Sequence, residues 1–303
     1  MEGLSLVEVR VPASTANLGP GFDCLGMALS LYNTVHMEYL PNGLEITVIG
    51  EGKDEIPLDD TNLVFRAAKA VFDKVQVEPP GLHIVLVNQI PLARGLGSSA
   101  AALVGGVVAA NALSGNNLSR KELLNLVNFL EGHPDNVGAA LFGGVVISVP
   151  TETGVEVFPF APPAVQVVAL VPEFHLPTNM VREILPSHVA FQDAVYNIGR
   201  ACLLVGALST GRTEFLRTAM QDVLHQPYRR RLIAGMDKAL VEATAAGALG
   251  VALSGAGPTL IALCRNRDDS NRVGDVMLRV FETEGIKARV FTLAPDTSGA
   301  VVI

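Results

Sequence analysis

Residues 91–101, Pro-Leu-Ala-Arg-Gly-Leu-Gly-Ser-Ser-Ala-Ala, form a glycine and serine loop between an apolar, strand-like run and an alanine-rich, helix-like run. Gly95 and Gly97 permit positive φ and close approach of the backbone to a ligand, and Ser98 and Ser99 supply hydroxyl groups. The free N–H groups and positive dipole end of the following helix would point at the same place. The loop therefore predicts a site for a nucleotide or another phosphate ester.

The loop alone does not identify the phosphate ligand. It is not a Walker A loop, because the lysine that would reach the β- and γ-phosphates is missing. Residues 95–100 do satisfy the dinucleotide pattern G-x-G-x-x-G/A, but the preceding strand ends at Pro91, whereas the dinucleotide turn is tight. No strand ending in Asp or Glu appears about 20 residues further on. A loop that merely caps the helix is the structural alternative.

Two further loops of small residues lie far away in sequence. Residues 9–23 run from a strand-like segment into Ala-Asn-Leu-Gly-Pro-Gly-Phe-Asp, and residues 250–259 place Ser-Gly-Ala-Gly-Pro between two apolar runs. Three such ordered loops suggest one shared site. Together they resemble the three motifs of the GHMP kinases, a family of ATP-dependent kinases of small-molecule alcohols.

The segments between the loops extend the resemblance to roughly residues 5–300. Glu-Gly-His-Pro-Asp-Asn at 131–136, His-Gln-Pro-Tyr-Arg at 225–229 and Asp-Thr-Ser-Gly-Ala at 296–300 are similar to the branch that phosphorylates a hydroxy amino acid. The resemblance implies an α+β, two-domain fold: an N-terminal ribosomal S5 domain 2-like ATP-binding domain and a C-terminal ferredoxin-like domain. It also implies ATP and Mg²⁺ as cofactors and L-homoserine as the substrate, in threonine synthesis.

The nucleotide end of the expected site consists of the first and third loops. Backbone amides of the first loop would bind the triphosphate without a lysine, as a helix N-terminus does. The resemblance implies that Ser98 and Glu131 bind Mg²⁺. The structural alternative for Glu131 is a surface carboxylate at a helix end. Arg94 has two open alternatives, contact with a nucleotide phosphate or solvation. The expected ATP-binding residues are Pro91, Leu92, Ala93, Arg94, Gly95, Leu96, Gly97, Ser98, Ser99, Ala100, Ala101, Ser254, Gly255 and Gly257.

The acceptor end of the site should contain partners for the two charges of an amino acid. An ammonium requires acidic or amide oxygens, and a carboxylate requires arginine forks. The positions that match the family's substrate side are Asn17, Asp23, His133, Asp135, Arg182 and Arg229. A pocket for mevalonate would need no partner for an ammonium. His133 has a structural alternative, because a residue before Pro134 can simply begin the next helix.

The expected catalytic residues are Ser98, Glu131 and Asn136. An aspartate that is bonded to an ammonium has a lowered proton affinity and is a poor base. We therefore expect Asp135 to anchor the substrate and Asn136 to orient its hydroxyl, with catalysis by positioning and electrostatics. The alternative is that Asp135 acts as a general base.

Composition bounds these expectations. The 303 residues suffice for two domains, and the net charge of −8 opposes a nucleic-acid partner, which would need a basic face. Three cysteines without metal spacing, together with no recognised signal peptide, favour a reduced cytoplasmic protein. Mean hydropathy is +0.38, but the apolar runs fall short of the roughly 20 residues that span a bilayer. We expect no membrane partner, and a homodimer.

The order of predicted elements favours α+β. The expected domains are residues 1–155 and 156–303, with a seam at 150–163 where prolines and turn residues interrupt the pattern. Strands are expected near 5–12, 34–39, 44–49, 82–90, 144–149, 165–171, 249–254, 259–264 and 287–292. Helices are expected near 61–74, 98–113, 119–130, 135–141, 178–184, 189–209, 213–222, 230–246 and 270–284.

Three functions remain open at this point. The first is the kinase of a hydroxy amino acid that the resemblance implies. The second is a related kinase of an isoprenoid acid or a sugar, and the third is a non-catalytic protein that binds ATP or the amino acid. The presence of Ser98, Glu131 and Asp135 disfavours the third.

Overall fold

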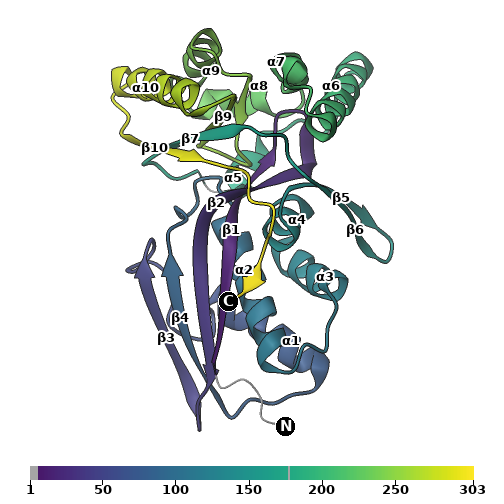
Figure 1. Cartoon of the computed structure of the whole chain (residues 1–303), viewed down its shortest axis with the longest axis vertical. Helices are drawn as coiled ribbons and strands as arrows, with labels where there is room; N and C mark the ends of the chain where they lie inside the picture. Colours follow the sequence, from purple (N-terminus) through teal and green to yellow (C-terminus); the bar gives the residue numbers. More distant parts are fainter. Residues whose placement is uncertain (1–5, 177) are drawn as a thin grey trace.

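The structure is a computed structural model that describes residues 6–176 and 178–303. Its strands form two sheets, each with helices against it (Figure 1). Within the described residues the larger sheet has seven strands, in the order β11-β1-β2-β4-β3 with the β5–β6 hairpin attached to β2. These strands are β1 (Leu6–Asn17), β2 (Gly21–Tyr39), β3 (Gly43–Gly50), β4 (Gly81–Asn88), β5 (Val145–Thr151), β6 (Gly154–Phe160) and β11 (Val301–Val302).

Helices α1 to α4 cover one face of the larger sheet (Figure 1). The first strand shows why: Val7, Val9 and Val11 are buried, while Glu8 and Arg10 between them are less so, the alternation expected of a strand with one covered face. The covering helices are α1 (Leu63–Val75), α2 (Ser98–Leu113), α3 (Arg120–Glu131) and α4 (Pro134–Phe142).

Helix α2 lies at the centre of this layer. Its residues are apolar or small on all sides and almost all are buried, as expected of a helix that is surrounded by other elements. It packs on α1, α3, α4 and β1. Two of its neighbours begin with clear sequence signals: Ser119 and Glu122 form a capping box at α3, and Pro134 occupies the first turn of α4. The N-terminus of α2 is thereby held at the junction of the two sheets.

The smaller sheet has the strand order β10-β7-β9-β8, with α9 (Met236–Ala245) and α10 (Arg267–Thr283) on the side away from the larger sheet and α5 (Thr178–Glu183) between the two sheets (Figure 1). Its strands are β7 (Gln166–Pro172), β8 (Gly250–Leu253), β9 (Leu260–Cys264) and β10 (Ala288–Leu293). The helical segments are α5 (Thr178–Glu183), α6 (Phe191–Thr210), η1 (Thr213–Phe215), α7 (Leu216–Ala219), α8 (Gln226–Arg229), η2 (Arg230–Leu232), α9 (Met236–Ala245) and α10 (Arg267–Thr283). No described helix combines the length and the hydropathy needed to span a membrane.

The α+β prediction is confirmed, and several boundaries differ from expectation. Strand β2 begins at Gly21 rather than near 34, and β6 was not predicted; the expected domain boundary at 155/156 falls inside β6. The predicted helix 213–222 is a 3-10 turn and one short helix, and the predicted helix 230–246 is interrupted at Gly235, which has a φ of +79°. Residue 5 of the first predicted strand lies outside the described residues.

The contact between α1 and α2 provides a test of the packing. A Cβ on Gly106 of α2 would lie 2.5 Å from the Val64 carbonyl oxygen and 2.8 Å from Ala67 Cβ, whereas a Cβ on Gly199 of α6 would meet open space. We expect Gly106→Ala to lower the free energy of unfolding by about 1–3 kcal/mol through overpacking. The control Gly199→Ala should raise it by about 0.5–1 kcal/mol through helix propensity. Urea unfolding measures both, and an equal effect of the two variants would contradict this packing.

Candidate active site

The three small-residue loops meet at the junction of the two sheets. The Gly255 N–H donates to the Ala16 carbonyl at 3.1 Å, which joins the third loop to the first strand. The Ser254 hydroxyl donates to the Gly95 carbonyl at 2.6 Å. Gly95 has a φ of +83°, and a side chain there would collide with the Ser254 carbonyl. The three loops therefore form one structural unit, although they lie far apart in sequence.

A cavity of about 130 Å³ opens between these loops. It is smaller than the roughly 300 Å³ at which pockets for drug-sized ligands begin, so its size suits the reacting ends of two substrates rather than a whole nucleotide. Both expected ends of the site contribute to its lining. The predicted residues in the lining are Asn17, Asp23, Ala93, Arg94, Gly95, Gly97, Ser98, Ser99, Glu131, His133, Asp135, Asn136, Arg182, Arg229, Gly255 and Gly257.

Six of the predicted nucleotide contacts are not in the lining of the cavity. Leu96 and Ser254 are completely buried, and the Ser254 hydroxyl is occupied by the Thr15 hydroxyl and the Gly95 carbonyl. These two side chains stabilise the loop: the buried Ser254 hydroxyl is hydrogen-bonded, and the buried Leu96 side chain packs in the core. The predicted contacts outside the lining are Pro91, Leu92, Leu96, Ala100, Ala101 and Ser254.

Arg94 lines the cavity, and its guanidinium is also bonded to backbone carbonyls. Its Nε donates to the Pro172 carbonyl at 2.9 Å, and its Nη1 donates to the Leu92 carbonyl at 3.0 Å. Burial lowers the pKa of Arg94 from its ordinary value. The guanidinium thus fastens the first loop to the end of β7, and the side chain acts as a tie between the two sheets.

The N-terminus of α2 faces the phosphate end of the cavity. Gly97, in the left-handed conformation, begins the helix without any side-chain cap, so the N–H groups of the first turn have no capping side chain. Ser98 lines the cavity beside them. Backbone N–H groups and the helix dipole at this point favour an anion such as a phosphate.

Glu131 faces the same end of the cavity, as the last residue of α3. The Ser99 hydroxyl donates to its Oε2 at 2.7 Å. Burial raises the pKa of Glu131, and the Ser99 hydrogen bond opposes that rise. Glu131 is therefore not a solvated carboxylate at a helix end. No group of three or more His, Cys, Asp or Glu side chains within the described parts of the chain could hold a metal ion by itself.

Two arginines mark the opposite end of the cavity. Arg182 pairs with Asp23 through two hydrogen bonds of 2.7 and 3.0 Å, and its buried Nε has no partner in the part of the chain that the structure describes. Arg229 is 2% exposed, donates through Nη1 to the Gly255 carbonyl at 3.0 Å, and also has a buried, unpartnered Nε among the described residues. Burial lowers the pKa of Arg229 to about 10, which leaves it charged at neutral pH. Within residues 6–176 and 178–303, both lining arginines therefore keep an Nε–H donor without a partner.

Asp135 and Asn136 lie between the two ends, in the first turn of α4. Asp135 is 3% exposed and accepts a hydrogen bond from the Asn136 N–H at 2.7 Å. Burial raises its pKa to about 6. The Ser14 hydroxyl donates to the Asn136 Oδ1 at 2.9 Å, which directs the amide oxygen toward β1 and leaves the NH₂ group as the free end. Ser14 was not among the predicted site residues.

His133 begins α4 without capping it. The side chain makes no cap hydrogen bond, although Pro134 follows in the first turn, and burial lowers the pKa of His133. Phe22 is a site residue that sequence reasoning missed: its ring centroid lies 5.5 Å from Cζ of Arg182 and 5.1 Å from Cζ of Arg229. An aromatic residue in a polar Gly-Pro loop was the available signal.

Known proteins of one family are similar to this chain over nearly its whole length. A family model described as the GHMP kinases N terminal domain matches residues 62–144, and one described as GHMP kinases C terminal matches residues 204–283. The chain is 47% identical to a homoserine kinase of Carboxydothermus hydrogenoformans, over 98% of this chain and 96% of that protein. It is 48% identical to a homoserine kinase of Moorella thermoacetica, over 97% and 99%. The crystal structure of a homoserine kinase from Cytophaga hutchinsonii superposes with a TM-score of 0.92 at 32% identity, covering 100% of this chain and 99% of that one.

The buried charge of Asp135 predicts a measurable loss of stability. Its folded pKa of about 6 lies above the ordinary 3.8, so the ionised form is disfavoured in the folded protein. The resulting loss in the free energy of unfolding is absent below pH 3.8 and grows as the pH rises from 3.8 to 6. Above pH 6 it is complete, at about 3 kcal/mol. Asp135→Asn should therefore unfold at higher temperature than the wild type at pH 8, with a smaller gain at pH 4.5.

A matched variant separates this effect from a general loss of charge. Asp23→Asn removes the ion pair with Arg182 and should give no gain in melting temperature at either pH. An Asp135→Asn protein that is less stable than the wild type at pH 8 would show that the carboxylate contributes to the fold rather than burdening it.

Proposed function

The chain belongs to the GHMP kinase family, and we propose that it is a homoserine kinase. It transfers the γ-phosphoryl group of ATP to the side-chain hydroxyl of L-homoserine and releases ADP and O-phospho-L-homoserine, a step in threonine biosynthesis. The relatives named homoserine kinase match at 47% and 48% identity over nearly all of this chain. The charges in the cavity support the same substrate independently.

The observation that carries the proposal is a cavity lined by two arginines, whose Nε–H groups have no partner among the described residues, and by the carboxylates of Asp23 and Asp135. L-Homoserine bears an ammonium and a carboxylate on one carbon. Its carboxylate suits the free edges of Arg182 and Arg229, because planar forks bind carboxylates through two parallel hydrogen bonds. Its ammonium suits Asp23 and Asp135. An isoprenoid acid such as mevalonate has no ammonium and would leave the buried Asp135 without a cation.

The other end of the cavity suits the phosphates of ATP. The N–H groups of the first turn of α2 are directed at the oxygens of the γ-phosphoryl group, and Gly97 allows the chain to approach them. Ser98 and Glu131 would hold Mg²⁺, which takes one or two protein oxygens and keeps the rest of its shell as water and phosphate. When bound, the ion neutralises charge on the β- and γ-phosphate oxygens.

Catalysis follows from position rather than from a strong base. Phosphoryl transfer requires the hydroxyl, the phosphorus and the leaving oxygen to be roughly in line, and little covalent chemistry is left to the protein. The free amide NH₂ of Asn136 suits a hydrogen bond to a substrate oxygen, while the α2 amides meet the charge that develops on the phosphoryl group. Asp135 holds the ammonium, and this contact keeps the carboxylate ionised and weakly basic.

The proposal includes the protein's setting. We place the linker between the domains at residues 161–165, after β6, because β6 and β11 belong to the larger sheet. A homodimer in the cytoplasm completes the proposal. Phe191, Val195 and Ile198 on one side of α6 are each more than half exposed, an apolar surface of the kind that a second copy covers. Analytical ultracentrifugation tests the dimer.

Two truncated substrates test the recognition of both charges. 4-Hydroxybutyrate is L-homoserine without the ammonium, and 3-aminopropan-1-ol is L-homoserine without the carboxylate. Each loss leaves buried charged groups unpaired, so kcat/KM should fall at least about 100-fold for each compound relative to L-homoserine in an ADP-release assay. Mevalonate should be as poor. Turnover of mevalonate with a kcat/KM similar to that of L-homoserine would overturn the assignment.

Two neighbouring substitutions separate anchoring from orientation. Asn136→Ala should lower kcat by about 10- to 1,000-fold, because one well-placed hydrogen bond to the reacting oxygens is lost. Asp135→Asn should act mainly on the KM for L-homoserine. The control Asp73→Asn, on the exposed face of α1, should leave both parameters unchanged. A collapse of kcat in Asp135→Asn with normal affinity for L-homoserine would make Asp135 the general base.

A further inference from the structure

Arg229 is aligned by one of its nitrogens and leaves another edge free. Nη1 carries two hydrogens: one points to the Gly255 carbonyl at 3.0 Å and the other to Nδ1 of His225 at 3.2 Å. Within the described residues Nε has no partner. With Nη1 fully occupied, the edge formed by Nε and Nη2 is the one available for two parallel hydrogen bonds to a carboxylate.

The partners of the His225 ring fix where its single proton lies. The ring is completely buried, and Nε2 lies 2.7 Å from the Gly19 carbonyl oxygen. A carbonyl only accepts, so Nε2 carries the hydrogen and Nδ1 offers its lone pair to Arg229. Burial lowers the pKa of His225; Asp222 and Asp23 oppose that shift, and the positive charge of Arg229 adds to it. The ring is neutral in its working state.

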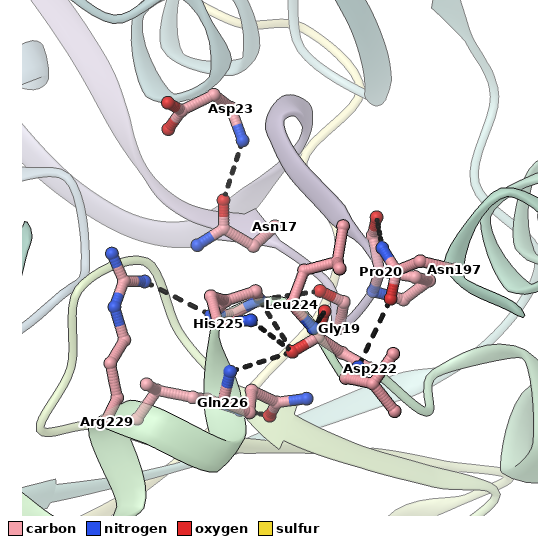
Figure 2. A network of polar contacts seen from close by, with 12 residues as sticks. Asn17, Gly19, Pro20, Asp23, Asn197, Asp222, Leu224, His225, Gln226 and Arg229 are labelled. Atoms are coloured by element: carbon pink, nitrogen blue, oxygen red, sulfur yellow. Dashed lines mark hydrogen bonds and ion pairs between the residues drawn. The ribbon is translucent and has the colours of Figure 1, made fainter. Parts of the chain in front are cut away.

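Asp222 and Asn197 hold the turn that carries the ring, and Oδ2 of Asp222 also lies 3.6 Å from Nε2 of the imidazole (Figure 2). The Asp222 carboxylate accepts the backbone N–H groups of His225 at 3.0 Å and Gln226 at 2.7 Å, which fixes the turn that begins α8. Asn197 of α6 bridges this turn to the Gly19–Pro20 loop: its amide donates to the Pro20 carbonyl at 2.9 Å and accepts from the Val223 N–H at 3.2 Å. The Phe22 ring packs at 5.1 Å from the imidazole.

We propose that His225 is a positioning residue that sets the rotation of the Arg229 guanidinium for side-on binding of the homoserine carboxylate. The imidazole connects the β1–β2 loop to α8: one ring nitrogen bonds to the Gly19 carbonyl, and the other bonds to Arg229. The β1–β2 loop of the first domain and Arg229 of the second domain are thereby fixed relative to each other. This inference rests on the proposed function, because it assigns the carboxylate of that substrate to Arg229.

Histidine suits this place because one rigid ring offers a donor at one end and an acceptor at the other. Two amides divide these functions. In His225→Asn the amide oxygen lies near the place of Nδ1 and still accepts from Arg229. In His225→Gln the longer amide reaches the place of Nε2, keeps the bond to Gly19 and loses the acceptor toward Arg229. His225→Phe keeps the packing on Phe22 and loses both hydrogen bonds.

Steady-state kinetics of these variants test the inference. His225→Gln and His225→Phe should raise the KM for L-homoserine by about 10- to 100-fold, the effect of one hydrogen bond to a charged group, with little change in the KM for ATP. His225→Asn should restore most of the affinity. The control His83→Gln, in β4 beside Glu38, should behave as the wild type. Equal KM values in the Asn and Gln variants, or equal changes for ATP and L-homoserine, would overturn the inference.

A second measurement needs neither turnover nor a folded variant. Nitrogen-15 NMR of the wild type should show His225 as the neutral form with its proton on Nε2 at pH 7. A proton on Nδ1 would overturn the inference, because Nδ1 could not then accept from Arg229. Failure of the wild type to phosphorylate L-homoserine would instead overturn the proposed function and would leave the NMR result unaffected.

Discussion

The backbones of three loops lie within hydrogen-bonding distance of one another, and the position of every group in the site depends on that contact. Gly255 meets Ala16, and Gly95 meets the hydroxyl of Ser254. No side chain fits at Gly95, and the Ser254 hydroxyl inside the contact is bonded to both the Thr15 hydroxyl and the Gly95 carbonyl. The contact aims the N-terminus of α2 and the two arginines into the same small cavity. In the proposed function, the binding of phosphate and the binding of the amino acid would both depend on this contact.

The charges of the cavity are arranged for a ligand rather than for stability. The Nε–H groups of Arg182 and Arg229 have no partner among the described residues, and burial raises the pKa of Asp135 to about 6. Each of these features costs free energy in the folded protein without a ligand. Under the proposed function, an amino acid would supply a partner to each, its carboxylate to the arginines and its ammonium to the aspartates. Sites that violate the usual rules of folding in this way are where function is expected.

The amino-acid sequence predicts local features well and long-range contacts poorly. Helix α2 occupies 98–113 as predicted, because a glycine precedes its alanine-rich run and a turn follows it. The first half of β2 was missed, since it pairs partly with the distant β5 and shows no simple alternation. The supporting contacts of Arg94 and Ser254 were not predicted, because their partners lie in distant parts of the chain and a motif does not reveal which side chains also hold the loop. The residues that line the cavity were mostly anticipated by the family resemblance rather than by spacing.

A crystal structure of the protein with L-homoserine and a non-hydrolysable ATP analogue tests the central claim most directly. We expect the substrate carboxylate within hydrogen-bonding distance of the Nε atoms of Arg182 and Arg229, and the ammonium beside Asp23 and Asp135. The γ-phosphate should lie at the N-terminus of α2, in line with the homoserine hydroxyl. A carboxylate bound away from both arginines, or an amino acid bound outside this cavity, would contradict the account.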